Sequence, residues 1–135
     1  LHLEVHSFPT RRSSDLAMYR LKTGVMISGA AELGCVAADM PADMRAQAVE
    51  FADRLGLAFQ IRDDMLDVVG DQQVLGKPIG SDKEEGKITY VDVDGLEGCA
   101  RAVESCTQKA KDAVAHWPEH DFLFALADQL VDRKK

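Results

Sequence analysis

The segment 55–69 limits most strongly what this chain can fold into. Its sequence is LGLAFQIRDDMLDVV. Read as an α-helix, it carries apolar side chains around most of its circumference, which is typical of a buried helix. The polar exceptions Gln60, Asp63, Asp64 and Asp67 fall within one arc of roughly 100°. The segment therefore predicts a central core helix with a single acidic face.

The acidic face has two interpretations. Buried carboxylates are costly without a compensating cation or hydrogen-bond donors, and three of them within about one turn repel one another. A divalent cation would relieve that repulsion, and Mg²⁺ usually takes one or two protein carboxylates together with water and phosphate oxygens. The first interpretation is thus a metal–diphosphate site in which Asp63, Asp64 and Asp67 serve as ligands. The second is an ordinary solvated face of a helix.

Residues 1–16 are interpreted as a translated artefact rather than as part of the fold. The segment HSFPTRRSSDL at positions 6–16 is what a common short-read sequencing adapter would encode. A natural polar leader is the alternative. We therefore expect the true polypeptide to enter at about Ala17, in the middle of a longer chain, and residues 17–135 to form one helical unit.

Charge and cysteine content exclude several classes of protein. The net charge of −7 and the pI near 5.0 argue against nucleic acid and anionic membrane surfaces as main partners. The sequence has no apolar run of transmembrane length and therefore no predicted membrane anchor. Cys35, Cys99 and Cys106 are odd in number and lack metal-ligand spacing. A reduced, cytoplasmic protein fits this pattern best.

The remaining pattern predicts helices only. Helices are expected over residues 17–35 and 41–69, the second ending at Gly70, and a third should begin at an Asp94–Glu97 capping box. A final helix should cover residues 122–131, since apolar side chains recur there at helical spacing. No alternation of strand period occurs, so the predicted fold class is all-α.

A glycine-rich loop is expected at residues 71–88. Lys77 and Lys87 each follow a glycine in this loop, but neither lies in a phosphate-binding P-loop motif. They are either ordinary loop charges or cations that close over an anion held by the metal. Lys22 shares a helix side with apolar residues, so it is either a snorkelling lysine or a third such cation.

Five short motifs in this order resemble the trans-polyprenyl diphosphate synthases. They are Lys22-Thr23-Gly24, Gly56-Leu57-Ala58-Phe59-Gln60, Asp63-Asp64-Met65-Leu66-Asp67, Leu75-Gly76-Lys77 and Gly86-Lys87-Ile88-Thr89-Tyr90. The chain looks most like the bacterial short-chain enzymes, farnesyl or geranylgeranyl diphosphate synthase. The resemblance covers nearly all of residues 17–135 and implies the C-terminal part of an isoprenoid-synthase-type helical bundle.

The resemblance also implies an activity and roles for these residues. The family condenses isopentenyl diphosphate with an allylic diphosphate, with Mg²⁺ as cofactor, and its members are typically homodimers. By motif, Asp63 would bind Mg²⁺, with Asp64 and Asp67 supporting it directly or through water. The roles implied for the other site residues are diphosphate binding by Lys22, Lys77 and Lys87, and lining of the reacting centre by Thr23 and Gln60.

The resemblance is incomplete in one respect that affects function. The family's first aspartate-rich motif, its arginine pair and its isopentenyl diphosphate site would lie before Ala17 and do not occur in this sequence. We therefore expect a fragment that is inactive alone, derived from a prenyltransferase. The alternative is a non-catalytic helical partner subunit of a prenyl synthase.

The interpretation of residues 1–16 leads to a first prediction. Deleting them should leave the thermal midpoint of unfolding unchanged, because a segment that was never selected to pack contributes no buried contacts. Circular dichroism of the chain with and without residues 1–16 provides the measurement. A drop of several degrees would show that the segment belongs to the fold.

Overall fold

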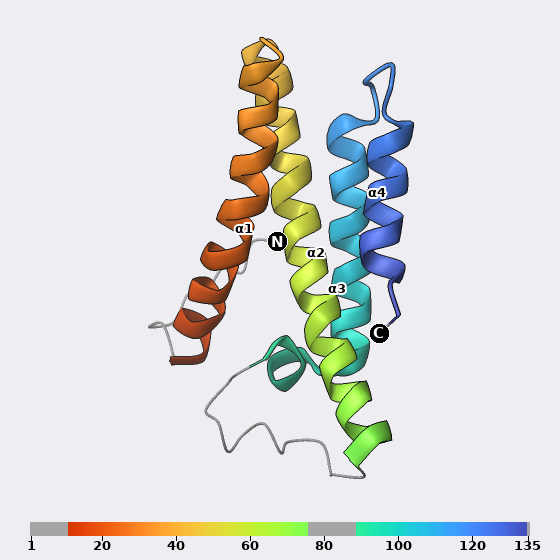
Figure 1. Cartoon of the computed structure of the whole chain (residues 1–135). Helices are drawn as coiled ribbons and strands as arrows, with labels where there is room; N and C mark the ends of the chain where they lie inside the picture. Colours follow the sequence, from red (N-terminus) through yellow and green to blue (C-terminus); the bar gives the residue numbers. More distant parts are fainter. Residues whose placement is uncertain (1–10, 76–88, 135) are drawn as a thin grey trace.

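The computed structural model describes the backbone of residues 11–75 and 89–134, and the side chains of residues 18, 21–70 and 89–134. Four helices make up the described chain: α1 (Arg11–Ala37), α2 (Ala42–Leu75), α3 (Tyr90–Val114) and α4 (Asp121–Asp132). Consecutive helices run in opposite directions (Figure 1). The described residues contain no strand, and the predicted all-α fold is confirmed.

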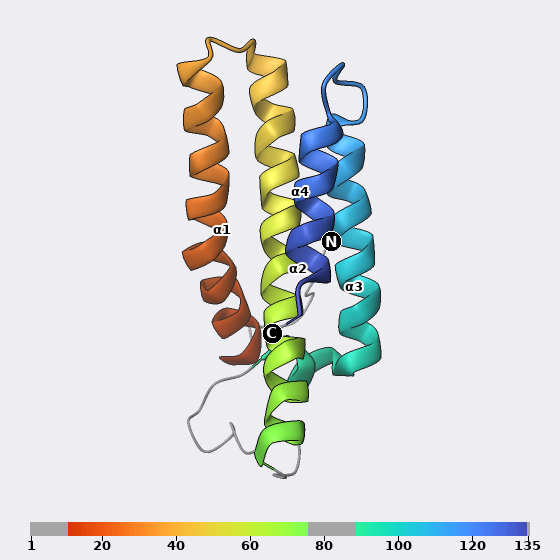
Figure 2. The ribbon, with the colours of Figure 1, turned by 45° about the vertical axis from the view of Figure 1, so that its right-hand side comes forward.

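The central element is α2, as predicted. It packs against α1 on one side and against α3 and α4 on the other (Figures 1 and 2). Two apolar clusters form the core along these contacts. The first, between α2 and α3, consists of Leu57, Ala58, Ile61, Cys99, Val103 and Cys106. The second, which also includes α4, consists of Phe51, Leu55, Ala110, Val114 and Ala127.

The predicted end of the central helix at Gly70 is wrong. The helix α2 continues through Gly70 to Leu75. A glycine ends a helix when it adopts the left-handed conformation, and Gly95 is the one glycine with positive φ among the described residues. At a helical φ, a glycine weakens the helix by about 1 kcal/mol relative to alanine but does not stop it.

The predicted start of the third helix is also wrong. Thr89 is the N-cap of α3, and its hydroxyl and backbone N–H form a reciprocal capping box with Asp92. The expected cap at Asp94 lies next to a kink at Gly95, where φ is 71° and ψ is 170°. The kink separates a short first turn from the rest of α3 (Figure 1). Sequence reasoning identified the second segment and missed the turn before it.

The first helix begins earlier than predicted. It starts at Arg11 rather than near Ala17, and it ends at Ala37 rather than Cys35. The backbone of residues 11–16 is therefore helical, while residues 1–10 lie outside the described part. Deleting residues 1–16 removes these helical residues as well, so the thermal midpoint is the decisive measurement for that deletion.

The helices α1 and α2 approach each other closely at Gly56. A Cβ atom built at Gly56 would lie 3.8 Å from the Cα atom of Gly24 and 3.3 Å from the Cδ1 atom of Ile27. The absence of a side chain at Gly56 thus leaves room for α1, and a side chain at this position would crowd Ile27.

Helix α1 also carries exposed apolar side chains. Leu21, Val25, Met26, Leu33 and Val36 are each more than half exposed. Exposed apolar patches on one helix favour association with another apolar surface. None of the described helices has the length and hydropathy needed to cross a bilayer.

The exposed face of α1 leads to a second prediction. The isolated chain should self-associate, and the double substitution Met26→Gln and Leu33→Gln should reduce this association. These side chains are 76% and 71% exposed, so their loss should change the thermal midpoint little. Sedimentation velocity over a range of concentrations measures the effect. The control is Phe122→Gln, which removes an equally exposed apolar side chain, 74% exposed, from α4. An equal effect of the control would contradict the assignment to α1.

Candidate active site

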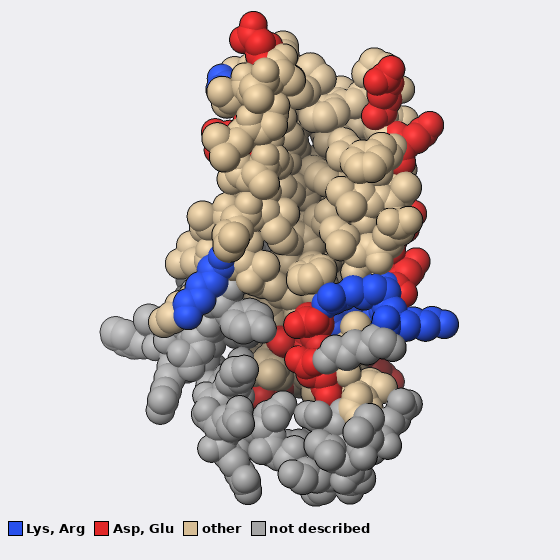
Figure 3. Space-filling view, viewed as in Figure 1, with Lys and Arg blue, Asp and Glu red and all other residues tan. Residues whose placement is uncertain are grey.

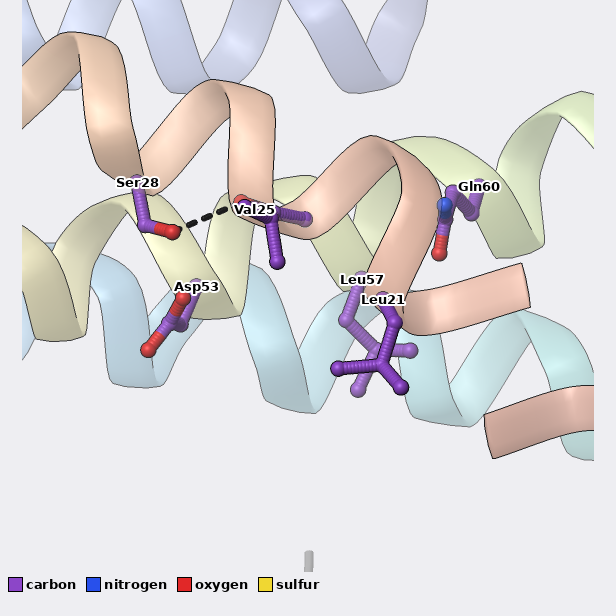
Figure 4. A pocket seen from close by; sticks show the side chains of 7 residues that line it. Leu21, Val25, Ser28, Asp53, Leu57 and Gln60 are labelled. Carbon is purple, nitrogen blue, oxygen red and sulfur yellow. Dashed lines mark hydrogen bonds between the residues drawn. The ribbon is translucent and has the colours of Figure 1, made fainter. Parts of the chain in front are cut away.

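A groove of about 380 Å³ lies between α1 and α2. The residues that line it are Leu21, Gly24, Val25 and Ser28 of α1, with Asp53, Leu57 and Gln60 of α2 (Figure 4). The Ser28 hydroxyl donates to the carbonyl oxygen of Gly24 at 2.7 Å, which satisfies its hydrogen within α1. Gln60 is only 3% exposed, so a polar amide borders a mostly apolar groove.

Asp64, about one helical turn after the groove residue Gln60, is buried. It is 5% exposed, and its carboxylate accepts a hydrogen bond from the backbone N–H of Tyr90 at 3.1 Å. Tyr90 is the first residue of α3, where backbone N–H groups have no partner within the helix. Asp64 therefore ties the middle of α2 to the start of α3.

Burial changes the acidity of Asp64. Loss of solvation raises the pKa of its carboxyl from the ordinary 3.8 to about 6. The hydrogen bond from Tyr90 lowers this pKa, while the neighbouring charges of Asp63, Asp67 and Asp92 raise it further. The effect of Asp63 and Asp67 has the direction expected for neighbouring carboxylates on this face, and Asp92 of α3 adds to it.

Asp63, in contrast, has a positive partner. It forms an ion pair with the guanidinium of Arg133, the residue directly after α4. The two side chains are 37% and 35% exposed, respectively. The guanidinium carbon of Arg133 also lies 4.1 Å from the centroid of the Phe59 ring, one helical turn before Asp63. The positively charged guanidinium of Arg133 therefore already lies against one side of the acidic face.

The acidic face is visible on the surface. Figure 3 shows acidic side chains gathered over the lower half of α2, beside basic side chains at the end of α4. Asp67 is half-buried one turn after Asp63. Within the described residues, no group of three or more His, Cys, Asp or Glu side chains is placed to hold a metal ion. The role of Asp63, Asp64 and Asp67 as metal ligands stays a prediction.

The lysines assigned to the diphosphate fall in different parts of the chain. On α1, Lys22 is exposed and Thr23 is half-buried, next to the groove residues Leu21 and Gly24. Lys77 and Lys87 lie outside the described residues. The structure thus describes Lys22, Thr23 and Gln60 on the two helices that border the groove, and their catalytic roles stay predictions.

Comparison with known proteins decides the family. The sequence profile described as Polyprenyl synthetase matches residues 8–120. The chain belongs to the polyprenyl synthetase family. The matched range includes part of residues 1–16, whose interpretation as an artefact stays a prediction.

Several relatives of this polyprenyl synthetase chain are named as prenyl diphosphate synthases. A short chain isoprenyl diphosphate synthase of Methanocaldococcus jannaschii is 40% identical over 97 residues, which is 72% of this chain and 30% of the relative. The farnesyl diphosphate synthase of Escherichia coli is 38% identical over 124 residues, 87% of this chain and 41% of the relative. A geranylgeranyl diphosphate synthase of Cyanophora paradoxa is 33% identical over 113 residues, with coverages of 83% and 38%. The chain therefore spans well under half the length of these relatives.

Two contacts of this polyprenyl synthetase chain were missed by sequence reasoning. The Arg133–Asp63 pair joins residues 70 positions apart, and the Tyr90–Asp64 hydrogen bond joins residues 26 positions apart. Arg133 looked like an ordinary basic residue after a helix, and a backbone N–H leaves no trace in the sequence. An unexplained carboxylate on a buried helix was the one available signal, and it indicated a cation or a donor without identifying it.

The raised pKa of Asp64 leads to a third prediction. Folded Asp64 keeps its proton up to about pH 6, while the unfolded chain releases it near 3.8. Ionisation of buried Asp64 therefore lowers the stability of the folded state. This loss of stability is absent below about pH 4 and complete above about pH 6. The substitution Asp64→Asn should remove it, because the amide oxygen can still accept from Tyr90 without carrying charge.

The measurement is the free energy of urea unfolding in metal-free buffer between pH 4 and pH 7. The difference between Asp64→Asn and wild type should move in favour of the variant as the pH rises, by up to about 3 kcal/mol. Asp43→Asn is the control, since it removes an acidic side chain from the exposed first turn of the same helix. A pH-independent difference for Asp64→Asn would contradict the prediction.

Proposed function

We propose that this chain is part of a trans-prenyltransferase that joins isopentenyl diphosphate to an allylic diphosphate. The product would be a short-chain prenyl diphosphate, farnesyl or geranylgeranyl. The observation that carries this proposal is the acidic face of α2, which includes Asp63 and lies beside a groove bordered by Gln60, in a chain of the polyprenyl synthetase family. The names of the relatives support the choice of product class.

The proposed reaction breaks one bond and forms another. The allylic carbon–oxygen bond breaks, and the diphosphate leaves with the electron pair. The double bond of isopentenyl diphosphate then attacks the allylic cation, a carbon–carbon bond forms, and a proton is lost. The protein must therefore stabilise negative charge on the leaving group and shield a cation from water.

The donor set of α2 fits Mg²⁺. Carboxylate oxygens are its usual protein ligands, and it commonly takes one or two of them beside phosphate oxygens and water. Asp63 is the first choice, because it is partly exposed and already faces a positive group. Asp64 and Asp67 would support it directly or through water. Bound Mg²⁺ would neutralise charge on the departing diphosphate.

Basic residues would hold the other side of the diphosphate. Exposed Lys22 can extend toward an anion from α1. Lys77 and Lys87 are proposed for the same role from sequence alone. Thr23 and Gln60 would line the reacting centre, where an amide oxygen and a hydroxyl can stabilise a nearby cation without reacting with it. The apolar residues of the groove would keep water from that cation.

The alternative hypothesis is that the chain is part of a non-catalytic partner subunit. It would use the same helices for association and would need no acidic face. The repulsion that Asp63 and Asp67 add to buried Asp64 favours the enzyme, since the structural bond from Asp64 to Tyr90 does not need those two carboxylates. A cytoplasmic location and a homodimer of the whole enzyme belong to the proposal as well.

A chimera provides the fourth prediction. The chain alone should not catalyse prenyl transfer, because the proposal needs carboxylates from a facing helix. Joined to the N-terminal part of the farnesyl diphosphate synthase of Escherichia coli, it should produce prenyl diphosphate from labelled isopentenyl diphosphate and an allylic primer with Mg²⁺ present. Asp63→Ala in this chimera should lower the rate by two or more powers of ten, roughly the effect of a lost metal contact.

Asp43→Ala is the matched control in the chimera, because it removes a carboxylate from the exposed first turn of the same helix. It should leave the rate within about twofold of the parent, a change below 0.5 kcal/mol. Robust turnover by the isolated chain would refute the fragment interpretation. A folded chimera whose rate is unchanged by Asp63→Ala would refute the metal role.

A further inference from the structure

The ion pair between Arg133 and Asp63 connects the residue after α4 to the middle of the acidic face. The same guanidinium lies over the ring of Phe59, one turn earlier on α2. Arg133 is thus held from two sides by one helix. Asp63 is also the proposed metal ligand. Its carboxylate could therefore pair either with Arg133 or with the metal ion.

We infer that Arg133 and a divalent cation compete for the Asp63 carboxylate, so that cation binding releases Arg133 from α2. The inference rests on the proposed function, since it takes Asp63 as a metal ligand. A guanidinium and a divalent cation a few ångströms apart repel each other, so joint occupation is disfavoured. Coupling between two ligands is reciprocal: Arg133 weakens cation binding by the factor by which the cation weakens Arg133 docking.

The contacts of Arg133 are weak enough to be reversed. The ion pair is about one-third exposed on both sides, so water screens it. An ion pair and a cation–π contact of this kind together favour the docked state by about 3- to 30-fold. In addition, the Nε atom of Arg133 is buried without a hydrogen-bond partner in the described part of the chain. Release would let water satisfy that N–H group.

The release should be local. Lys111 of α3 and Asp128 of α4 form an ion pair of 2.6 Å, and Ala127 is fully buried in the core, so α4 stays attached without Arg133. Arg133 itself has φ −55° and ψ 139°, outside the helical region. A rotation there would move its side chain from α2 and leave the preceding helix in place.

Binding of Mn²⁺, followed by electron paramagnetic resonance, tests the competition on the full 135-residue chain. Arg133→Gln should tighten the Asp63-dependent binding by about 3- to 30-fold. Lys134→Gln is the matched control, because it removes the same charge from an exposed neighbouring side chain. It should change that binding less than twofold, roughly the effect of one screened charge. Asp63→Asn identifies the relevant component by abolishing it.

Nuclear magnetic resonance of ¹⁵N-labelled arginine supplies a second readout. The aromatic ring of Phe59 should shift the Arg133 side-chain Nε–H signal, and Phe59→Leu identifies that signal by removing the shift. Saturating Mg²⁺ should remove the ring-induced shift of this signal, because the guanidinium leaves the ring. An Arg133 that served only for packing would keep its shift when Mg²⁺ binds.

The outcomes separate this inference from the proposed function. If Asp63-dependent binding is present and Arg133→Gln behaves like Lys134→Gln, the competition is refuted while the metal role stands. If the Arg133 signal keeps its shift at saturating Mg²⁺, the release is refuted. If Asp63→Asn changes binding in neither the chain nor the chimera, the metal role fails and the inference fails with it.

Discussion

The hydrogen bond between the buried Asp64 carboxylate and the backbone N–H of Tyr90 connects the parts of this structure that matter for function. It spans 3.1 Å and ties the middle of α2 to the first residue of α3. An isolated buried carboxylate would be costly, and an uncapped helix start would leave its N–H groups without partners. This one hydrogen bond gives the carboxylate a donor and gives the Tyr90 N–H group an acceptor. It also brings Thr89, the N-cap of α3, close to the acidic face.

The three aspartates of the family motif consequently have different surroundings. Asp64 is buried and bonded to backbone, whereas Asp63 is partly exposed and paired with Arg133. Asp67 is half-buried one turn further on. Equivalent residues in a sequence motif thus differ in how freely they could meet a cation. Asp63 is the carboxylate that is partly exposed and paired with a positive side chain, which is why the proposals on metal binding centre on it.

Sequence reasoning predicted most of the fold and only part of the site. The all-α class, the central helix and the final helix followed from hydrophobic period, because burial of one face dictates that period. The end at Gly70 was wrong, because a glycine ends a helix only through its φ, which composition does not show. The start at Asp94 was wrong, because the reciprocal capping box forms five residues earlier, between Thr89 and Asp92. The partners of Asp63 and Asp64 belong to helices that are distant in sequence. A local sequence pattern does not show which distant residue will contact a given side chain.

The glycine contact between α1 and α2 has a consequence for how related sequences can vary. At Gly56 the missing side chain leaves room for Ile27 and for the backbone of Gly24 on α1. A larger residue at position 56 would push the two helices apart. Groove residues such as Leu21 and Val25 take no part in this contact, so they could be exchanged for larger or smaller ones, which would reshape the apolar end of the groove. The polar end of the site would keep its alignment while the apolar end diversified.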